Sequence, residues 1–466
     1  MATAMEKAAN TRLQAIKNTS DDKRNAYAQH LTPPETARLA VSMFSELESD
    51  EVFIKCLDLG AGTGMLSTAL NNRYNGHIER LDAVESDEVL AVIFEAEMAS
   101  VGIPHRLING DVLTQTPDEL YDRVILNPPY KKMAANDSRQ KLLPCRSANL
   151  YSAFIAVGLS RLADGGELVA IVPRSWMNGD YFAPFRRYAL TFFSLDALHI
   201  YGSRTDIFSD TKVLQEIMLV KFSNRKQCEY VQVSHSIGKS DEITQAAYPA
   251  KALIDPFNFV VRSNPEENGK LSKTIGSVGL CPSTGKVVDF RCRDSVFEKR
   301  PDNPNSYPLL YAGNFTNKGV LHPAKIRKPQ WYVANSEKMR KQLTEPGIYV
   351  VVKRFSSKEE KKRVVASPLV LDVSVAIENH LNFIHAGMPR KVVSLRSKEL
   401  AFGLTIWLNS TFIDEWFRGV SGSTQVNARD IKAMPCPSIE DLEAMGAKWH
   451  PSMNQAEIDE ICEKTR

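Results

Sequence analysis

The stretch Asn127-Pro128-Pro129-Tyr130 brings together side chains that are suited to chemistry. It follows an apolar run at 123–126, which predicts a buried strand that the two prolines end. Proline fixes φ and has no N–H group, so Pro128 and Pro129 predict a stiff corner whose carbonyl groups can accept hydrogen bonds. Asn127 adds an amide oxygen and Tyr130 a flat ring. This set suits a planar ring with an exocyclic NH2 group, held by oxygen acceptors and stacked on the aromatic face. The alternative is a proline-rich turn with a capping asparagine and a half-buried tyrosine.

A glycine-rich motif, Gly60-Ala61-Gly62-Thr63-Gly64, follows a predicted buried strand at 52–59 and precedes a predicted helix at 65–70. A strand, a glycine-rich turn and a helix form the first unit of a doubly wound parallel sheet, in which ligands bind beyond the carboxyl ends of the strands. Glycine accepts positive φ and lets a ligand approach the backbone. The G-x-G-x-G spacing differs from the dinucleotide fingerprint, which ends in G-x-x-G.

Two acidic residues stand at the ends of the next two predicted strands. Glu85 ends the run at 81–85, about 20 residues after the glycines, where an acid can hold ribose hydroxyl groups. Asp111 follows the run at 105–108 and could accept a hydrogen bond from an adenine amino group. Either one alone could be a solvated carboxylate, but three successive strand ends with suitable groups favour a binding site.

The remaining patterns predict an α/β, Rossmann-like doubly wound domain at 1–235 and a β-rich mixed domain at 236–466. A helix start is expected at Thr32 to Glu35, with Thr32 as N-cap, Pro33 at the first helical position and Glu35 completing a capping box. The lysine-containing polar loop at 131–147 is long enough to cover a site. Further predictions are helices at 176–189 and 404–417 and a strand at 213–222.

Composition limits the classes of function. With 466 residues, 43% of them apolar and a net charge of only +3, the chain is long enough for two cores, and any nucleic-acid surface must be local. Seven cysteines without a C-x-x-C pair argue against disulfides and zinc sites, and no run is apolar enough for a signal peptide or a membrane span. We therefore expect a reduced, cytoplasmic protein with no metal and no membrane partner.

A basic cluster in the second domain is a candidate DNA surface, although Glu359 and Glu360 dilute it and a solvated loop is the alternative. Its members are Lys353, Arg354, Lys358, Lys361, Lys362 and Arg363.

These motifs together resemble those of amino-group DNA methyltransferases that use S-adenosylmethionine, in the gamma order of cofactor motif, NPPY and target-recognition domain. The segment 58–64 is similar to the family's first cofactor motif, and segment 27–34 to its N-terminal cofactor segment, although His30-Leu31 replaces the usual aromatic pair. The segment 422–427 is similar to the end of the recognition domain in Eco57I-type restriction–modification methylases. The cofactor contacts that the resemblance implies come from Tyr27, Thr32, Pro33, Asp58, Gly60, Ala61, Gly62, Gly64, Glu85, Asp111, Val112 and Asn127.

The resemblance implies transfer of a methyl group to N6 of an adenine that has rotated out of duplex DNA. The two N6 protons would donate to the Asn127 side-chain oxygen and the Pro128 carbonyl, and the base would stack between Tyr130 and Phe208. These residues and Pro129 are the implied catalytic set. We expect a monomer that serves as the modification component of a restriction–modification system, with any cognate endonuclease acting separately.

Three alternatives stay open. The same NPPY corner can bind a protein glutamine, although about half of this chain would then have no evident role. An RNA base or cytosine N4 is also possible, but N4 enzymes more often have Ser-Pro-Pro-Tyr. A DNA-binding protein without activity would have no reason to keep the whole set of motifs. Cytosine-C5 chemistry needs a thiolate, and neither Cys145 nor Cys436, each preceded by proline, follows a strand end of the predicted sheet.

Overall fold

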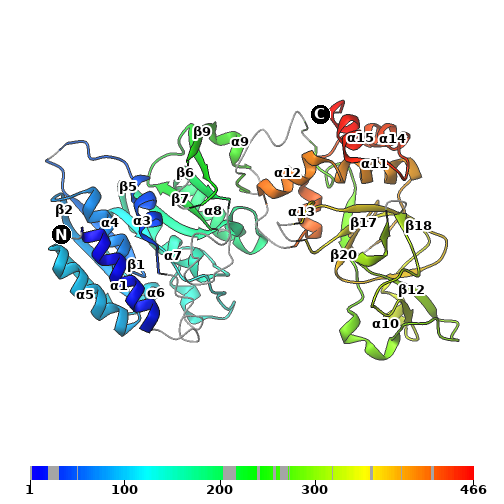
Figure 1. The fold of residues 1–466 in the computed structure, drawn as a ribbon, viewed down its shortest axis with the longest axis horizontal. Coiled ribbons are helices and arrows are strands. Elements are labelled where there is room, and N and C mark those ends of the chain that lie inside the picture. Colours follow the sequence, from blue (N-terminus) through cyan, green and yellow to red (C-terminus); the bar gives the residue numbers. More distant parts are fainter. Residues whose placement is uncertain are drawn as a thin grey trace. The chain divides into compact units, whose positions relative to one another are not determined.

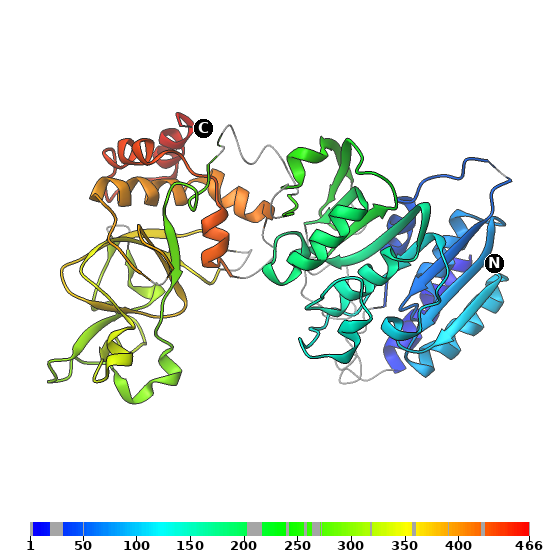
Figure 2. The same cartoon turned by 180° about the vertical axis from the view of Figure 1, so that it is seen from behind.

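The computed structural model describes residues 3–18, 31–49, 51–202, 217–238, 242–255, 259–262, 271, 273–316, 319–356, 360–389, 391–420 and 425–465. The chain forms two compact units, Met1–Pro265 and Glu266–Arg466 (Figure 1). Figure 2 shows the far side of each unit. Within the described residues, no helix combines the length and the apolar character that a membrane crossing requires.

A nine-stranded sheet in the order β3-β2-β1-β4-β5-β7-β6-β8-β9 is the framework of the first unit. Its strands are β1 (Ile54–Leu59), β2 (Ile78–Glu85), β3 (His105–Asn109), β4 (Tyr121–Leu126), β5 (Leu162–Pro173), β6 (Ser194–Tyr201), β7 (Ile217–Ser223), β8 (Tyr230–Ser236) and β9 (Thr244–Pro249). The strands from β3 to β5 are parallel, and β7 runs antiparallel to β5 and β6. The strand order reverses between β1 and β4, which is the switch point where such sheets bind ligands. The predicted Rossmann-like α/β fold is confirmed.

Helices cover both faces of this sheet. They are α1 (Ala4–Asn18), α3 (Pro34–Ser42), α4 (Met65–Arg73), α5 (Glu88–Val101), α6 (Val112–Gln115), α7 (Leu150–Leu159), α8 (Ala183–Phe192) and α9 (Ala250–Leu253). Successive strand residues point to opposite faces, so Val124 and Leu126 join a core with α6, α7 and α8, whereas Ile125 joins a core with α1, α3, α4 and α5. Both faces are therefore buried, which explains the continuous apolar run before Asn127.

The second unit is β-rich and mixed, as predicted. Its described residues include a four-stranded sheet, β10-β20-β17-β18, a five-stranded sheet, β11-β15-β12-β19-β16, and a β13-β14 pair. The strands are β10 (Cys281–Thr284), β11 (Val296–Phe297), β12 (Ser306–Leu310), β13 (Phe315–Thr316), β14 (Gly319–Val320), β15 (Trp331–Val333), β16 (Leu343–Thr344), β17 (Gly347–Lys353), β18 (Ala366–Leu371), β19 (Val375–Ile377) and β20 (Leu381–His385). The helices are α10 (Glu337–Arg340), α11 (Lys398–Leu408), α12 (Thr411–Val420), α13 (Ala428–Ala433), α14 (Ile439–Gly446) and α15 (Gln455–Glu463). Val350 and Val352 of β17 pack in a core with helices α11 to α15, while Tyr349 and Val351 face a separate core.

Several predicted boundaries were wrong. The two units divide after Pro265, not after residue 235, because β8 and β9 extend the first sheet by pairing with β6 and with each other. The helix predicted at 404–417 is two helices, α11 and α12, interrupted at residues 409–410. The helix predicted at 176–189 is two 3-10 turns, η2 (Arg174–Met177) and η3 (Asp180–Phe182), followed by α8. Of the strand predicted at 213–222, residues 213–216 lie outside the described residues, and β7 covers the rest.

The predicted helix start is displaced by one residue. Helix α3 begins at Pro34, its N-cap is Pro33, and neither Thr32 nor Glu35 makes a capping hydrogen bond. Proline suits the first helical positions because its φ is already helical and the missing N–H would have no partner there. Thr32 is therefore available for a contact with Asn127.

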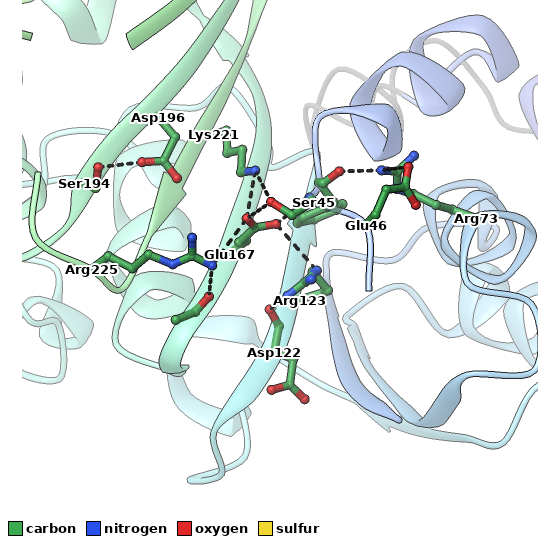
Figure 3. Close-up of polar contacts among 12 residues, drawn as sticks. Ser45, Glu46, Arg73, Asp122, Arg123, Glu167, Ser194, Asp196, Lys221 and Arg225 are labelled. Carbon is green, nitrogen blue, oxygen red and sulfur yellow. Dashed lines mark hydrogen bonds and ion pairs between the residues drawn. The ribbon is translucent and has the colours of Figure 1, made fainter. Parts of the chain in front are cut away.

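A buried ionic cluster ties the segment after α3 to the sheet (Figure 3). Glu167 of β5 is only 1% exposed and accepts hydrogen bonds from the Ser45 N–H (2.8 Å) and hydroxyl (2.6 Å). The Lys221 ammonium lies 2.8 Å from Glu167 Oε1, and Arg123 Nε lies 3.6 Å from Oε2. One carboxylate thus joins β4, β5, β7 and the chain that enters β1. Arg123 stands four residues before Asn127, so this cluster helps to fix the strand that carries the NPPY corner.

Candidate active site

The NPPY corner lies directly after the carboxyl end of β4. The Asn127 side-chain NH2 group donates to the Thr32 hydroxyl oxygen at 3.0 Å. The Tyr130 hydroxyl lies 3.0 Å from Asn127 Oδ1 and 3.1 Å from the Ile171 carbonyl oxygen, and its one proton serves one of these acceptors at a time. The amide is therefore oriented with its NH2 group toward Thr32 and its oxygen toward Tyr130. No feature of the sequence indicated the Thr32 contact, because the two residues are 95 positions apart.

Aromatic side chains support the Tyr130 ring. Tyr151 of α7 meets it edge to face, with ring centroids 6.2 Å apart, and Phe182 packs against Tyr151 at 5.1 Å. The Tyr151 hydroxyl hydrogen-bonds Ser175 at 3.0 Å. Burial raises the pKa of both Tyr130 and Tyr151 above the ordinary phenol range. Both rings are therefore neutral and rigidly held at neutral pH.

The glycine turn has the backbone that the sequence predicted. Gly60, Gly62 and Gly64 have φ of 80°, 58° and 86°. A Cβ atom on Gly62 would lie 3.1 Å from Leu31, and one on Gly64 would lie 2.9 Å from Met98. Larger residues would meet both strain and side-chain contacts at these positions.

Glu85 is joined to the glycine turn by its carboxylate. Gly62 N–H donates to Glu85 Oε2 at 2.8 Å, and Asp87 N–H donates to Oε1 at 2.8 Å. Burial raises the pKa of this carboxyl group. The end of β2 and the turn after β1 therefore form one structure, as expected for neighbouring parallel strands.

Asp58 is the buried acid of the glycine motif. Its Oδ2 accepts a hydrogen bond from Ser67 at 2.7 Å, whereas Oδ1 is buried and has no hydrogen-bond partner among the described residues. Burial raises the pKa of Asp58 to about 7. A buried carboxylate oxygen without a donor is costly unless a ligand supplies one.

Asp111 does not have the surroundings that the resemblance implied. It caps α6 by accepting from the Leu113 N–H at 2.9 Å, and its other oxygen accepts from Arg139 Nη1 at 2.9 Å. Arg139 also holds Asp137, at 3.0 Å and 2.7 Å. An adenine amino group would have to share this carboxylate with two protein donors. The basic composition of the loop at 131–147 was the signal for such a residue, but the sequence could not identify Arg139.

The polar loop after the NPPY corner closes at its base. Met133 N–H donates to the Ala148 carbonyl at 3.0 Å, and Leu150 N–H to the Lys131 carbonyl at 2.8 Å. The loop therefore leaves the NPPY corner and returns beside it at the start of α7.

The described part of the chain contains no group of three or more His, Cys, Asp or Glu side chains arranged to hold a metal ion. Burial raises the pKa of the thiol of Cys145 to about 11 and that of Cys436 to about 12. Neither cysteine has the thiolate character that cytosine-C5 chemistry requires.

Comparison with known proteins identifies the family. The family model of the methyltransferase small domain matches residues 36–180. The type II methyltransferase M.BsuBI of Bacillus subtilis is 34% identical to this chain, over 96% of this chain and 95% of that protein. The chain belongs to the type II DNA methyltransferases of restriction–modification systems. The type II methyltransferase M.PstI of Providencia stuartii is 31% identical, over 96% and 94% of the two chains.

The fold of the methyltransferase also has a solved counterpart. The type IIL restriction–modification enzyme MmeI in complex with DNA superposes with a TM-score of 0.52 at 11% identity. The match covers 96% of this chain and 71% of that one. At this identity the likeness concerns the fold.

The cofactor of the methyltransferase is S-adenosylmethionine, and the residues present fit it. Asp58 Oδ1, which has no hydrogen-bond partner among the described residues, suits the cationic α-amino group. The three glycines at positive φ keep the turn after β1 tight, with the Gly62 N–H bonded to Glu85. Tyr27, which the resemblance also assigned to the cofactor, lies outside the described residues, as do Phe208 and Lys358.

Replacing Asp58 by asparagine is expected to stabilise the cofactor-free methyltransferase at pH 8 and to weaken cofactor binding at least tenfold. The native pKa of about 7 lies above the ordinary value of 3.8, so ionisation in the buried site costs stability as pH rises between these values. At about 1.4 kcal/mol per pKa unit, the rise from 3.8 to about 7 gives a gain in unfolding free energy of about 4 kcal/mol at pH 8, and the gain falls close to zero at pH 4. Thermal unfolding at both pH values measures the gain in stability, and calorimetric titration measures the affinity for the cofactor.

Asp118→Asn is the control, because Asp118 is 92% exposed. A variant that binds the cofactor normally, or gains no stability at pH 8, contradicts this role.

The predicted DNA-binding cluster in the second unit is largely used inside the protein. Arg363 is fully buried, and its guanidinium carbon lies 5.0 Å from the centre of the Phe417 ring. The prediction that Arg363 contacts DNA was therefore wrong. Lys362 donates to the Asn409 carbonyl, and burial lowers its pKa. Lys353 pairs with Glu360 at 2.7 Å. Arg354 donates to the Asn379 carbonyl at 2.9 Å, and Lys361 is exposed. Sequence clustering of basic residues therefore did not identify a basic surface here.

Proposed function

We propose that the methyltransferase transfers a methyl group to N6 of an adenine that has rotated out of duplex DNA, and that it has the gamma motif order. The observation that carries this proposal is the oriented Asn127 amide at the end of β4. Its NH2 group is engaged by Thr32 at 3.0 Å, so its oxygen is the atom presented on the Tyr130 side. An oxygen acceptor next to an aromatic ring matches an exocyclic NH2 group on a planar base.

The residues of the NPPY corner orient the base through hydrogen bonds and stacking. Asn127 Oδ1 and the Pro128 carbonyl accept the two N6 protons, which favours a pyramidal nitrogen whose lone pair points away from both acceptors. The Tyr130 ring stacks on the base, and base–aromatic stacking contributes about 1–3 kcal/mol against the cost of rotating the base out. S-adenosylmethionine supplies an electrophilic methyl group on its sulfonium. Orientation then accounts for most of the remaining rate enhancement, and no covalent enzyme intermediate is required.

Two further points support DNA as the substrate. M.BsuBI and M.PstI are named type II methyltransferases, and the solved counterpart MmeI is bound to DNA. We assign catalysis to the unit that ends at Pro265 and target recognition to the unit that begins at Glu266. In this proposal Phe208 stacks on the other face of the base, the enzyme acts as a monomer in the cytoplasm, and a cognate endonuclease acts separately.

The proposal is tested by incubating the purified protein with methyl-labelled S-adenosylmethionine and, separately, duplex DNA, RNA and a protein extract. We expect label in duplex DNA and none in the RNA or protein samples. Label in RNA or protein alone would overturn the proposal and favour one of the alternative NH2 acceptors.

A further inference from the structure

An exposed basic loop of the second unit carries two cations, Lys325 and Arg327, that no acidic residue in the described part of the chain neutralises. The basic loop, residues 321–330, contains Lys325, Arg327 and Lys328 and no acidic residue. All three side chains are exposed. Lys328 pairs with Asp289 at 2.8 Å, whereas Lys325 and Arg327 form no ion pair or hydrogen bond with any residue that the structure describes.

Two buried amide side chains hold this loop in shape. Asn314 Nδ2 donates to the Leu321 carbonyl at 2.8 Å and to Gln330 Oε1 at 2.9 Å. Gln330 Oε1 accepts from the Ala324 N–H, and Gln330 Nε2 donates to the Ala324 carbonyl, both at 2.8 Å. His322 Nε2 lies 2.7 Å from the Gln330 carbonyl oxygen. The start, middle and end of the loop are thus fixed to each other through groups that are buried or partly buried.

The fixed conformation and the exposed cations of the basic loop suit the binding of an anion. A rigid loop loses little conformational entropy when it binds, so the attraction of its charges is retained in the affinity. Guanidinium and ammonium groups are the usual partners of phosphate oxygens. Burying two amides has a desolvation cost, and here the amides fix a segment in which Lys325 and Arg327 are exposed and form no ion pair or hydrogen bond within the described chain.

Apolar side chains are exposed in and next to the basic loop. Phe290 is 57% exposed in the turn η6 (Asp289–Arg291), to which Lys328 is joined through Asp289. The Arg291 guanidinium lies 5.6 Å from the Phe290 ring centre. Leu321, at the start of the basic loop, is 55% exposed. Exposed cations beside an exposed aromatic ring are the composition of nucleic-acid-binding surfaces.

We infer that the basic loop contacts the phosphate backbone of duplex DNA through Lys325 and Arg327. This inference rests on the proposed function, which makes duplex DNA the substrate. It replaces the cluster at 353–363 as the expected source of backbone contacts, because several members of that cluster are bonded internally, whereas Lys325 and Arg327 form no ion pair or hydrogen bond within the described residues. The inference also agrees with the net charge of only +3, because a chain with so little net charge needs a local basic surface to bind DNA.

The test compares wild-type protein with the double variant Lys325→Gln/Arg327→Gln on a duplex fragment that the wild-type protein methylates. Fluorescence anisotropy gives the dissociation constant over a series of salt concentrations. The logarithm of the association constant falls linearly with the logarithm of the salt concentration, and each phosphate contact contributes about 0.9 to the steepness of that line. The double variant should therefore have a slope that is shallower by about 1.8. At low salt we expect a loss of affinity of about 10- to 100-fold. KM for DNA should rise accordingly, while kcat at saturating DNA and cofactor affinity stay unchanged.

The matched control is Lys398→Gln/Lys448→Gln, which removes the same charge from exposed positions of the same unit. Its salt slope should equal that of the wild-type protein, and its affinity should change less than twofold. A wild-type slope in the loop variant, or an equal loss in both double variants, overturns the inference. The proposed function would survive either result, because wild-type DNA would still be labelled. If the wild-type protein labels no duplex DNA, the proposed function fails, and the inference fails with it.

Discussion

Replacing Asn127 by alanine is expected to lower the rate of methyl transfer by about 10²- to 10³-fold while cofactor affinity changes less than about threefold. Loss of one preorganised hydrogen-bonding group at a reacting centre has an effect of this size. In the proposed function the Asn127 oxygen acts on the acceptor base, whereas the buried Asp58 and the glycine turn are the groups assigned to the cofactor. Single-turnover rates with saturating DNA, together with calorimetric titration of the cofactor, separate the two effects.

Two further variants make this prediction sharper. Asn127→Asp keeps an oxygen on the Tyr130 side and should retain more activity than Asn127→Ala. Thr32→Val removes the hydroxyl that receives the Asn127 NH2 group at 3.0 Å, so the amide loses its fixed orientation. A net hydrogen-bond contribution of about 1 kcal/mol predicts a loss of about fivefold in rate for Thr32→Val. Full activity in Asn127→Ala would remove the proposed role of this amide.

Replacing Glu167 by glutamine is expected to lower the free energy of unfolding by about 3–5 kcal/mol. The substitution leaves Lys221 and Arg123 nearly buried, each about 10% exposed, without the carboxylate that neutralises them. Glu46→Gln is the matched control. Glu46 also pairs with an arginine, Arg73 at 2.9 Å, but it is 81% exposed, so its loss should cost less than about 1 kcal/mol.

The effect of Glu167 should depend on pH in a defined direction. Although burial alone would raise the pKa of Glu167, the hydrogen bonds from Lys221 and Ser45 bring it below the ordinary value of 4.5. A carboxyl group with a lowered native pKa stabilises the fold above its unfolded pKa, and that contribution is lost as pH falls through the native pKa. The difference between wild-type protein and Glu167→Gln in urea denaturation should therefore be constant from pH 8 to pH 6 and shrink below about pH 4.5. Equal stability of the two proteins at pH 7 would contradict the structural role of the cluster.

Features that depend on local sequence were predictable. The glycine turn requires residues that accept positive φ, and Gly60, Gly62 and Gly64 are the only ordinary choice for such a run. The end of β4 at Leu126 follows from the two prolines, which cannot continue a central strand. These two segments predicted the fold class, which is confirmed, and the position of the candidate site.

Features that depend on distant contacts were not predictable. Arg139 reaches Asp111 across 28 residues, and Thr32 reaches Asn127 across 95. The basic run that ends at Arg363 looked exposed because charged residues usually are, but helix α12 supplies Phe417 to cover that side chain. A run of charged residues in the sequence does not show which of its side chains are exposed. Their burial depends on which distant element packs against them.

The central claim is that the Asn127 corner methylates the exocyclic nitrogen of adenine in duplex DNA. The most direct measurement is mass spectrometry of nucleosides from unmethylated duplex DNA that has been incubated with the wild-type protein and S-adenosylmethionine. We expect N6-methyladenine as the methylated nucleoside, and none of it when Asn127→Ala is used. N4-methylcytosine in its place, or no methylated nucleoside under conditions where the protein binds its cofactor, would rule out adenine-N6 methylation at this corner.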